Sequence, residues 1–183
     1  MLLFPMNSHP TPLHGCFEII PKFYSDERGS FTETYNRERL ASTLGQTQFI
    51  QDNEVVSKHG VIRGMHFQKG SFAQAKLIRV LSGSIIDIVV DLRPDSPTYL
   101  KQHRVELSAE NHKQLFVPKG FAHGYSVCSS SAKVLYKVDA PYAPEAEGGI
   151  APLDPYFAFD WGLKKGEEII SERDLNWPLF HEE

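Results

Sequence analysis

Residues 78–91 read Ile-Arg-Val-Leu-Ser-Gly-Ser-Ile-Ile-Asp-Ile-Val-Val-Asp, a β-branched, apolar run that is broken only at Ser82-Gly83. Residues of this kind favour strands, and a Ser-Gly pair suits a tight turn between them. The stretch therefore predicts two strands, Lys76–Leu81 and Ser84–Asp91, that pair as a β-hairpin.

Segments of the same character continue in both directions along the chain, separated by Gly, Pro, Asn and Ser. Only Asn36–Gly45 has the pattern of a longer helix, with Asn36 as its cap and Gly45 at its end. The further predicted strands are Phe17–Ile20, Ser30–Tyr35, Phe49–Val56, Gly60–Phe67, Gln102–Leu107, Gln114–Val117, Gly124–Cys128 and Lys133–Val138. Many short strands with little helix predict an all-β protein, an antiparallel barrel or jelly roll.

The 183 residues suit a single domain, residues 1–183. Residues 1–14 form a Pro-rich N-terminal extension for which the sequence offers no interpretation. After Pro141 the strand pattern gives way to Pro, Gly and aromatic residues, and then to a charged stretch. This C-terminal part is expected to be an irregular cover on the barrel, not a second domain.

Composition and charge narrow the possible partners. The 19 basic and 23 acidic residues give a net charge of −4, which does not indicate a nucleic acid or an anionic membrane as partner. No apolar run approaches the length of a membrane span. Cys16 and Cys128 are the only cysteines, too few for a disulfide framework, so a cytoplasmic protein is expected.

Two histidines stand in strand contexts that favour a buried site. His123 ends a Pro-x-Gly-x-x-His spacing, which is similar to the second half-motif of the cupin barrels. In metal-binding cupins the first half-motif supplies His-x-His, but the corresponding place here is His66-Phe67-Gln68, and an amide is a poor ligand for a transition metal. The sequence therefore predicts no metal site and no cofactor, and protein groups must polarise the substrate.

The available groups fit proton transfer beside a ketone. This chemistry needs a base for the C–H proton, a cation for the enolate oxygen and an acid on the opposite face. His66, Lys76 and Tyr136 supply these three groups, with Arg63 as a further cation. Judged by spacing alone, Tyr136 and His66 are better interpreted as core residues whose polar atoms have partners, and Lys76 could be an exposed charge at the end of a strand.

Several segments, taken together, decide between these interpretations. In chain order they are Asp26-Glu-Arg-Gly29, Gln51-Asp-Asn53, Val61-Ile-Arg-Gly-Met-His-Phe-Gln68, Ala73-Gln-Ala-Lys-Leu-Ile-Arg-Val80, Val117-Pro-Lys-Gly-Phe-Ala-His-Gly124, Leu135-Tyr-Lys137, Glu147-Gly-Gly149 and Ser171-Glu-Arg-Asp174. The chain resembles the dTDP-4-dehydrorhamnose 3,5-epimerase family in all of them. Each motif alone is weak, but the ordered set covers almost the whole chain past its first dozen residues.

The resemblance implies a cupin-like jelly roll, a homodimer, that acts on dTDP-4-dehydro-6-deoxy-D-glucose. It implies that His66 is the base, held by Asp174, that Tyr136 is the acid, and that Lys76 lies near the C4 oxygen. It also implies a set of positions that hold the nucleotide and sugar, some of them from the partner subunit: Arg28, Glu33, Gln51, Asn53, Arg63, His123, Glu147 and Arg173. A guanidinium fork fits a diphosphate, which suits Arg28 and Arg63.

Two features set this chain apart from a simple transfer of the family pattern. Strict alternation places Arg63 and His66 on opposite faces of their strand, unless a bulge at Gly64 turns both inward. Residues 68–72 read Gln-Lys-Gly-Ser-Phe where the family often has Gln-x-Pro-Pro, which predicts a different lip to the site.

Other functions stay open at this stage. A mono-epimerase or ketoisomerase on a related nucleotide-linked 4-keto sugar would need the same inventory. A sugar-binding cupin without activity would have no use for both a base and an opposing acid. A metal-dependent cupin oxygenase is disfavoured by Gln68.

Overall fold

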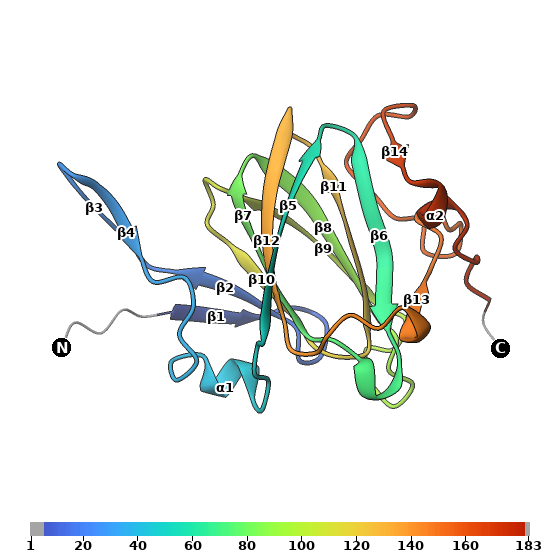
Figure 1. The fold of residues 1–183 in the computed structure, drawn as a ribbon, viewed down its shortest axis with the longest axis horizontal. Helices are drawn as coiled ribbons and strands as arrows, with labels where there is room; N and C mark the ends of the chain where they lie inside the picture. The colour runs from blue at the N-terminus through green and yellow to red at the C-terminus, as the bar shows by residue number, and fades with distance from the viewer. Residues whose placement is uncertain (1–5, 182–183) are drawn as a thin grey trace.

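The computed structural model of the protein describes residues 6–181. Within them, short strands form two larger sheets in which neighbours run antiparallel, apart from β14, and one separate hairpin (Figure 1). The first sheet has the order β1-β2-β10-β7-β12-β5, and the second has the order β13-β6-β11-β8-β9, with β14 beside β6. The predicted all-β, cupin-like jelly roll is confirmed.

The strands of the first sheet are β1 (Met6–Pro10), β2 (Phe17–Pro21), β5 (Gln51–Lys58), β7 (Lys76–Ser82), β10 (Gln114–Val117) and β12 (Ser131–Val138). Those of the second are β6 (Val61–Gln68), β8 (Ser84–Asp91), β9 (Gln102–Ser108), β11 (Phe121–Val127), β13 (Glu147–Gly149) and β14 (Ile169–Ile170). The separate hairpin consists of β3 (Phe23–Asp26) and β4 (Gly29–Thr32), and it projects from the body (Figure 1). The helical elements are α1 (Ala41–Leu44), α2 (Glu172–Leu175) and the 3-10 turns η1 (Gly70–Phe72) and η2 (Pro144–Ala146). None of the helices within residues 6–181 is long and apolar enough to cross a membrane.

The strands β7 and β8 form as predicted, but the prediction that they pair as a hairpin is wrong. β7 pairs with β10 and β12 in the first sheet, whereas β8 pairs with β11 and β9 in the second. Gly83, with φ of +75°, carries the chain from one sheet to the other. Residues 85–91 are all buried, so β8 has both faces covered, which fits a strand in the middle of a sheet between two packed layers.

The other element boundaries differ in detail. The predicted helix 36–45 contracts to α1, because residues 37–40 form a turn in which the Asn36 side chain accepts hydrogen bonds from the Glu38 and Arg39 amides. Gly45 ends α1 with φ of +54°. The strand predicted for Ser30–Tyr35 is the shorter β4, and β1 and β3 were not predicted. Of the N-terminal extension, residues 6–10 form the edge strand β1, and residues 1–5 lie outside the described residues.

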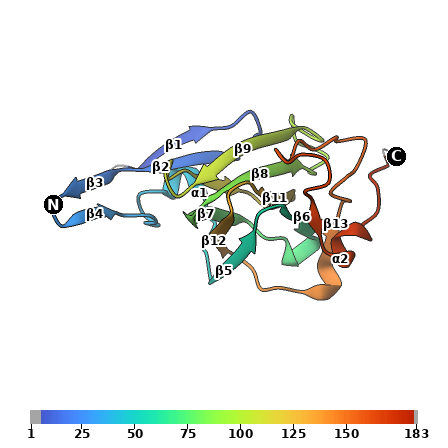
Figure 2. The same cartoon turned by 90° about the horizontal axis from the view of Figure 1, so that it is seen from above.

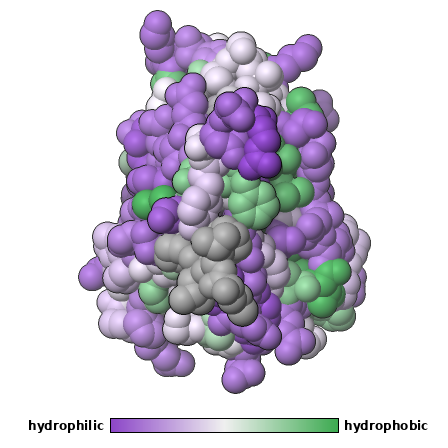
Figure 3. All heavy atoms as spheres, turned by 90° about the vertical axis from the view of Figure 1, so that its left-hand side faces the viewer, coloured by the Kyte–Doolittle hydropathy of each residue, from purple (hydrophilic) through white to green (hydrophobic). Residues whose placement is uncertain are grey.

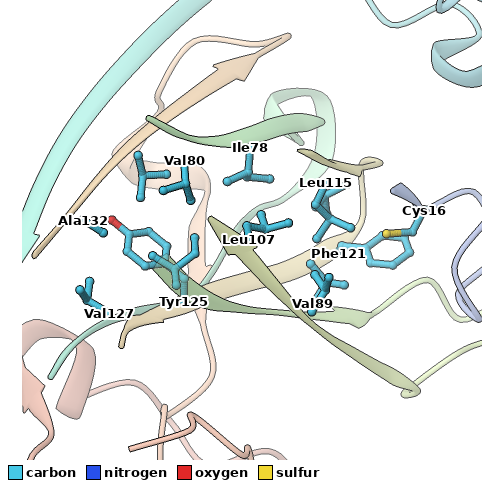
Figure 4. Packing of buried hydrophobic residues seen from close by; sticks show 14 of the residues in the cluster. Cys16, Ile78, Val80, Val89, Leu107, Leu115, Phe121, Tyr125, Val127 and Ala132 are labelled. Carbon is cyan, nitrogen blue, oxygen red and sulfur yellow. The ribbon is translucent and has the colours of Figure 1, made fainter. Parts of the chain in front are cut away.

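The main core fills the space between the two sheets. Figure 4 shows Ile78, Val80 and Leu115 of the first sheet packed toward side chains of the second, among them Val89 and Phe121. Seen from above, β1 and β2 of the first sheet run beside β9 of the second (Figure 2). There His103 Nε2 of β9 lies 3.4 Å from Glu18 Oε1 of β2, so the two layers approach each other on this side.

The C-terminal segment covers the outer face of the second sheet, as the sequence predicted. Ile150, Phe157, Phe159 and Trp161 pack there with outward-facing residues of β8, β6 and β11. The Asp154 carboxylate ties this cover together by accepting hydrogen bonds from the backbone of residues 156, 157 and 180. Near its end the cover forms α2, which contacts β6.

Candidate active site

A cavity of about 260 Å³ lies between the sheets, bounded by β5, β7 and β12 on one wall and by β6 and β11 on the other. Predicted site residues from both walls and from the C-terminal segment line it: Arg63, His66, Lys76, His123, Tyr136, Glu147 and Arg173. These residues are as much as 110 positions apart in the chain, from Arg63 to Arg173, so only the fold brings them together.

A bulge in β6 turns both Arg63 and His66 into this cavity. His123 of β11 stands opposite His66, and Tyr125 stands opposite Arg63, so three steps on β6 match two on β11. The extra residue lies at Gly64-Met65, where Gly64 has φ of +144°. A Cβ on Gly64 would lie 2.5 Å from the Cα of Gly124, so this close approach of two strands requires glycine. The bulge that the sequence only permitted is therefore present.

His66 is paired with a carboxylate from the end of the chain. Its Nε2 lies 2.7 Å from Asp174 Oδ1, and the carboxylate can only accept, so Nε2 carries a hydrogen; in the neutral ring Nδ1 then has a lone pair. Burial raises the pKa of Asp174, but the hydrogen bond and charge of His66, with donors from Gly64 and Ser171, bring that pKa below its usual value. α2 positions Asp174, and Ser171 caps α2 by accepting from the Asp174 amide.

A second histidine–carboxylate pair lies beside the first. His123 Nε2 lies 3.0 Å from Asp87 Oδ2, and both residues are buried. Burial lowers the pKa of His123, Asp87 opposes this shift, and the charges of Lys76 and His66 reinforce it. Asp87 was not among the predicted site residues, although a lone aspartate inside the apolar run of residues 85–90 was a visible signal.

Lys76 and Tyr136 lie on the opposite wall, on β7 and β12. Burial lowers the pKa of Lys76 to about 8, and the charge of Asp87 opposes this shift. Burial raises the pKa of Tyr136, and the charge of Arg63 opposes the rise. Near neutral pH the cavity therefore offers an ammonium group and a protonated phenol across from the histidines.

Three side chains form a polar cluster at the edge of the cavity. Glu147 Oε2 accepts a hydrogen bond from the Tyr142 hydroxyl at 2.9 Å and forms an ion pair with Arg173, whose Nη2 lies 3.1 Å from the same hydroxyl. Arg173 also lies 6.0 Å from the ring centre of Trp177. Tyr142 was not among the predicted residues, and its neighbours in the sequence gave no sign that it joins Glu147 and Arg173 at the cavity.

The remaining predicted residues do not line the cavity. Gln51 and Asn53 lie on the edge strand β5, where Gln51 Nε2 donates to Asn53 Oδ1 at 2.8 Å. Arg28 lies at the turn of the β3–β4 hairpin and pairs with Asp26 at 2.6 Å. Glu33 follows β4 and pairs with Arg39 at 2.7 Å.

The amide of Gln68 is engaged by the backbone of neighbouring segments. It donates to the carbonyls of Phe72 and Pro141 and accepts from the Ala143 amide, which ties the 68–72 lip to the C-terminal segment. Among the side chains of residues 6–181, no cluster of three or more His, Cys, Asp or Glu has the arrangement of a metal site.

A cupin-like barrel whose cavity sets a histidine–carboxylate pair against a lysine and a tyrosine belongs to the class of enzymes that move protons on a bound substrate. The family model described as dTDP-4-dehydrorhamnose 3,5-epimerase matches residues 10–182. The chain belongs to this family, whose members are isomerases.

Individual relatives agree over nearly the whole chain. The dTDP-4-dehydrorhamnose 3,5-epimerase of Methanothermobacter thermautotrophicus is 44% identical over 94% of this chain and 93% of its own. The crystal structure of the enzyme of that name from Elizabethkingia anophelis has a TM-score of 0.92 at 44% identity and covers 96% of both chains. A Legionella pneumophila 3,5-epimerase in complex with dTDP-4-keto-L-rhamnose has a TM-score of 0.90 at 42% identity and covers 95% of this chain and 92% of its own.

Proposed function

We propose that the protein converts dTDP-4-dehydro-6-deoxy-D-glucose to dTDP-4-dehydro-L-rhamnose by inverting C3 and C5. The observation that carries the proposal is the division of the cavity: the His66–Asp174 pair lies on the wall built by β6, and Lys76 and Tyr136 lie on the wall built by β7 and β12. A base and an acid on opposite walls can remove a proton from one face of a carbon and return one to the other face.

The proposed steps need protein groups alone. Nδ1 of His66 takes the proton from the carbon beside the ketone, and the electron pair moves onto the C4 oxygen as an enolate. The Lys76 ammonium stabilises that oxygen, and Asp174 stabilises the imidazolium. Tyr136 then protonates the enolate carbon from the opposite face, which forms the new C–H bond and restores the C4 ketone. The imidazolium then releases a proton to solvent and the tyrosinate takes one up, so both groups return to their initial states.

The same pair of walls can serve both carbons, because C3 and C5 flank one ketone and are acidified by it. After the first inversion the ring must be presented again with the other carbon toward His66. Arg63, His123, Glu147 and Arg173 surround this space and are proposed to hold the sugar and nucleotide. Arg63 has the fork of donors that suits the diphosphate.

Deuterium exchange tests this proposal. Incubated in heavy water with dTDP-4-dehydro-6-deoxyglucose, the protein should place deuterium at both C3 and C5, followed by nuclear magnetic resonance of the sugar. Exchange at one carbon alone would identify a mono-epimerase. If the substrate binds tightly and neither carbon exchanges, the protein is a sugar-binding cupin and the proposal is wrong.

We also propose that the enzyme is a cytoplasmic homodimer in which each β3–β4 hairpin reaches the cavity of the partner subunit. The hairpin projects from the body, and it carries Phe31, 58% exposed, near Arg28 (Figure 1). Figure 3 views the molecule from the side on which this hairpin projects, and an apolar patch lies there among hydrophilic residues.

The strand β5 has a free edge. It pairs with β12 along one edge and with no strand of residues 6–181 along the other, and it exposes Val56. Such an edge favours cover by a second chain.

Mixing two inactive variants tests this assembly. Arg28→Ala removes a group that serves the partner's cavity, whereas His66→Ala removes one that serves its own. A mixed dimer has one cavity with both defects and one with neither, so random reassortment should restore about a quarter of the wild-type activity. No recovery after subunit exchange, or a monomer by sedimentation at micromolar concentration, would contradict the proposal.

A further inference from the structure

Two buried hydroxyl groups lie beside Arg63, where the edge of the first sheet meets β6. Ser57 on β5 is 5% exposed and accepts a hydrogen bond from Arg63 Nε, with 3.0 Å between Nε and Oγ. Tyr125 on β11 is 4% exposed and stands directly opposite Arg63 in the β6–β11 register. Both Arg63 and Tyr125 line the cavity, so the three side chains meet at its wall.

The Tyr125 hydroxyl has no hydrogen bond of good geometry to any of residues 6–181, although solvent does not reach it. A buried hydroxyl without a hydrogen-bond partner lowers the stability of the fold, so the groups around Tyr125 indicate the function of its hydroxyl. Burial raises the pKa of Tyr125, while the Ser57 hydroxyl and the charge of Arg63 oppose the rise. The phenol therefore stays neutral near pH 7, and a small rotation of either hydroxyl allows a bond between Tyr125 and Ser57.

The hydrogen bond from Arg63 Nε to Ser57 Oγ engages one side of the guanidinium group. Ser57 Oγ accepts from Arg63 and keeps its own proton to donate, and Tyr125 offers a lone pair for that proton. With Nε held by Ser57, the two Nη groups of Arg63 remain available for a ligand. The N–H bonds of the two Nη groups can then donate to phosphate oxygens, which a guanidinium fork binds well.

We propose that Ser57 and Tyr125 are positioning residues, which hold the Arg63 guanidinium toward the diphosphate of the bound nucleotide sugar. The inference rests on the proposed function for the identity of the ligand, a nucleoside diphosphate. The diphosphate takes no part in the proton transfers, so its binding contributes equally to the ground state and the transition state. Loss of the hydroxyl pair should therefore raise KM and leave kcat in place.

Tyr125→Phe removes one oxygen from this wall and leaves the aromatic packing. We expect dTDP, measured by calorimetry, to bind about three- to ten-fold more weakly, the range for one lost hydrogen bond. KM for the 4-keto sugar nucleotide should rise by the same factor while kcat changes by less than about two-fold. Tyr136→Phe is the matched control. It removes the same atom from a tyrosine on the opposite wall of the cavity, and it should lower kcat without weakening the binding of dTDP.

A double-mutant cycle separates positioning from general packing. In an Arg63→Ala background, Tyr125→Phe should no longer change dTDP affinity. An equal effect in both backgrounds, or no effect in the wild type, would overturn the inference. Should Tyr125→Phe unfold, Ser57→Ala takes its place in the same cycle. If the wild type binds dTDP but exchanges no deuterium, the epimerase proposal fails and the cycle still decides the positioning role; if dTDP does not bind at all, both are wrong.

Discussion

Two histidine–aspartate pairs lie side by side on one wall of the cavity, and they differ in how much water reaches them. His66 and His123 stand opposite each other between β6 and β11, and each sets Nε2 against a carboxylate, at 2.7 Å and 3.0 Å. The side chain of His66 is 30% exposed, whereas that of His123 is 9% exposed. The same pair of residue types therefore sits in two different environments.

The two carboxylates also differ in burial, and that of Asp87 is the more deeply buried. Asp174 arrives on α2 and is supported by the Gly64 amide and by Ser171. Asp87 is fully buried in β8, and its Oδ1 has no partner among residues 6–181. Burial lowers the pKa of His123, so this imidazole resists protonation. We propose that this difference in burial makes His66 the base and leaves His123 to hold the substrate.

Alanine substitution at the two histidines gives the largest expected difference. His66→Ala should reduce deuterium exchange at both C3 and C5 by about a thousand-fold or more, because the base is needed for the first step at each carbon. His123→Ala should reduce the exchange by about ten-fold, because the substrate is then positioned less precisely in front of His66. Equal losses in the two variants, measured by nuclear magnetic resonance, would contradict the assignment of His66 as the only base.

Tyr136→Phe tests the wall opposite the two pairs. The variant keeps both histidines, so proton removal and solvent exchange should continue. Inversion should fall by about a hundred-fold at the carbon that Tyr136 serves, because no acid remains on that face. Product formation and deuterium content are measured on the same sample. Parallel losses of exchange and inversion would show that Tyr136 acts earlier than the protonation step.

Asp174→Asn should have a smaller effect, since the amide still accepts a hydrogen bond from His66 through its oxygen. The lost charge no longer stabilises the imidazolium, and a hydrogen bond to a charged group contributes about 1.5–3 kcal/mol, which is roughly ten- to a hundred-fold in rate. We expect kcat to fall by that amount with KM nearly unchanged. A variant with full activity would mean that Asp174 has only a structural role at the β6–α2 contact.

The family motifs predicted much of this site, because each is a local pattern. Arg63, His66, Lys76, His123 and Tyr136 were all predicted, and all line the cavity. The β6 bulge was permitted by Gly64, but its presence depends on Gly124 of another strand. Local sequence cannot report such a pairwise fit.

What the sequence did not predict depends on long-range pairing. The run around Ser82-Gly83 fitted a hairpin equally well, and only the partners of β7 and β8 assign them to different sheets. Asp87 was visible as an aspartate in an apolar strand, yet its role depends on Lys76 and His123, which lie on other strands. Ser57 and Tyr125 carry no motif, and Ser57 reaches Arg63 from a different strand of the other sheet.

The smallest expected effect concerns Asp87 and the pH dependence of the enzyme. Burial lowers the pKa of Lys76 to about 8, and Asp87 opposes that shift. As pH rises through this pKa the ammonium loses its proton, so kcat/KM should fall above about pH 8. The fold should not weaken there, because the unfolded chain, with an ordinary lysine pKa near 10.4, binds more protons between the two values, and stability then rises with pH.

Asp87→Asn removes a negative charge that raises the pKa of Lys76, so the alkaline limb of kcat/KM should move to lower pH. His123 faces the same carboxylate, and losing it lowers the pKa of His123 further, so this histidine stays neutral and adds no opposing charge. At pH 7 the loss should be only a few-fold and should grow as pH rises toward 8. Asp174→Asn is the control, because its carboxylate pairs with His66 and it should leave the alkaline limb in place. An unchanged alkaline limb in Asp87→Asn would show that Lys76 is not the group whose deprotonation limits the reaction.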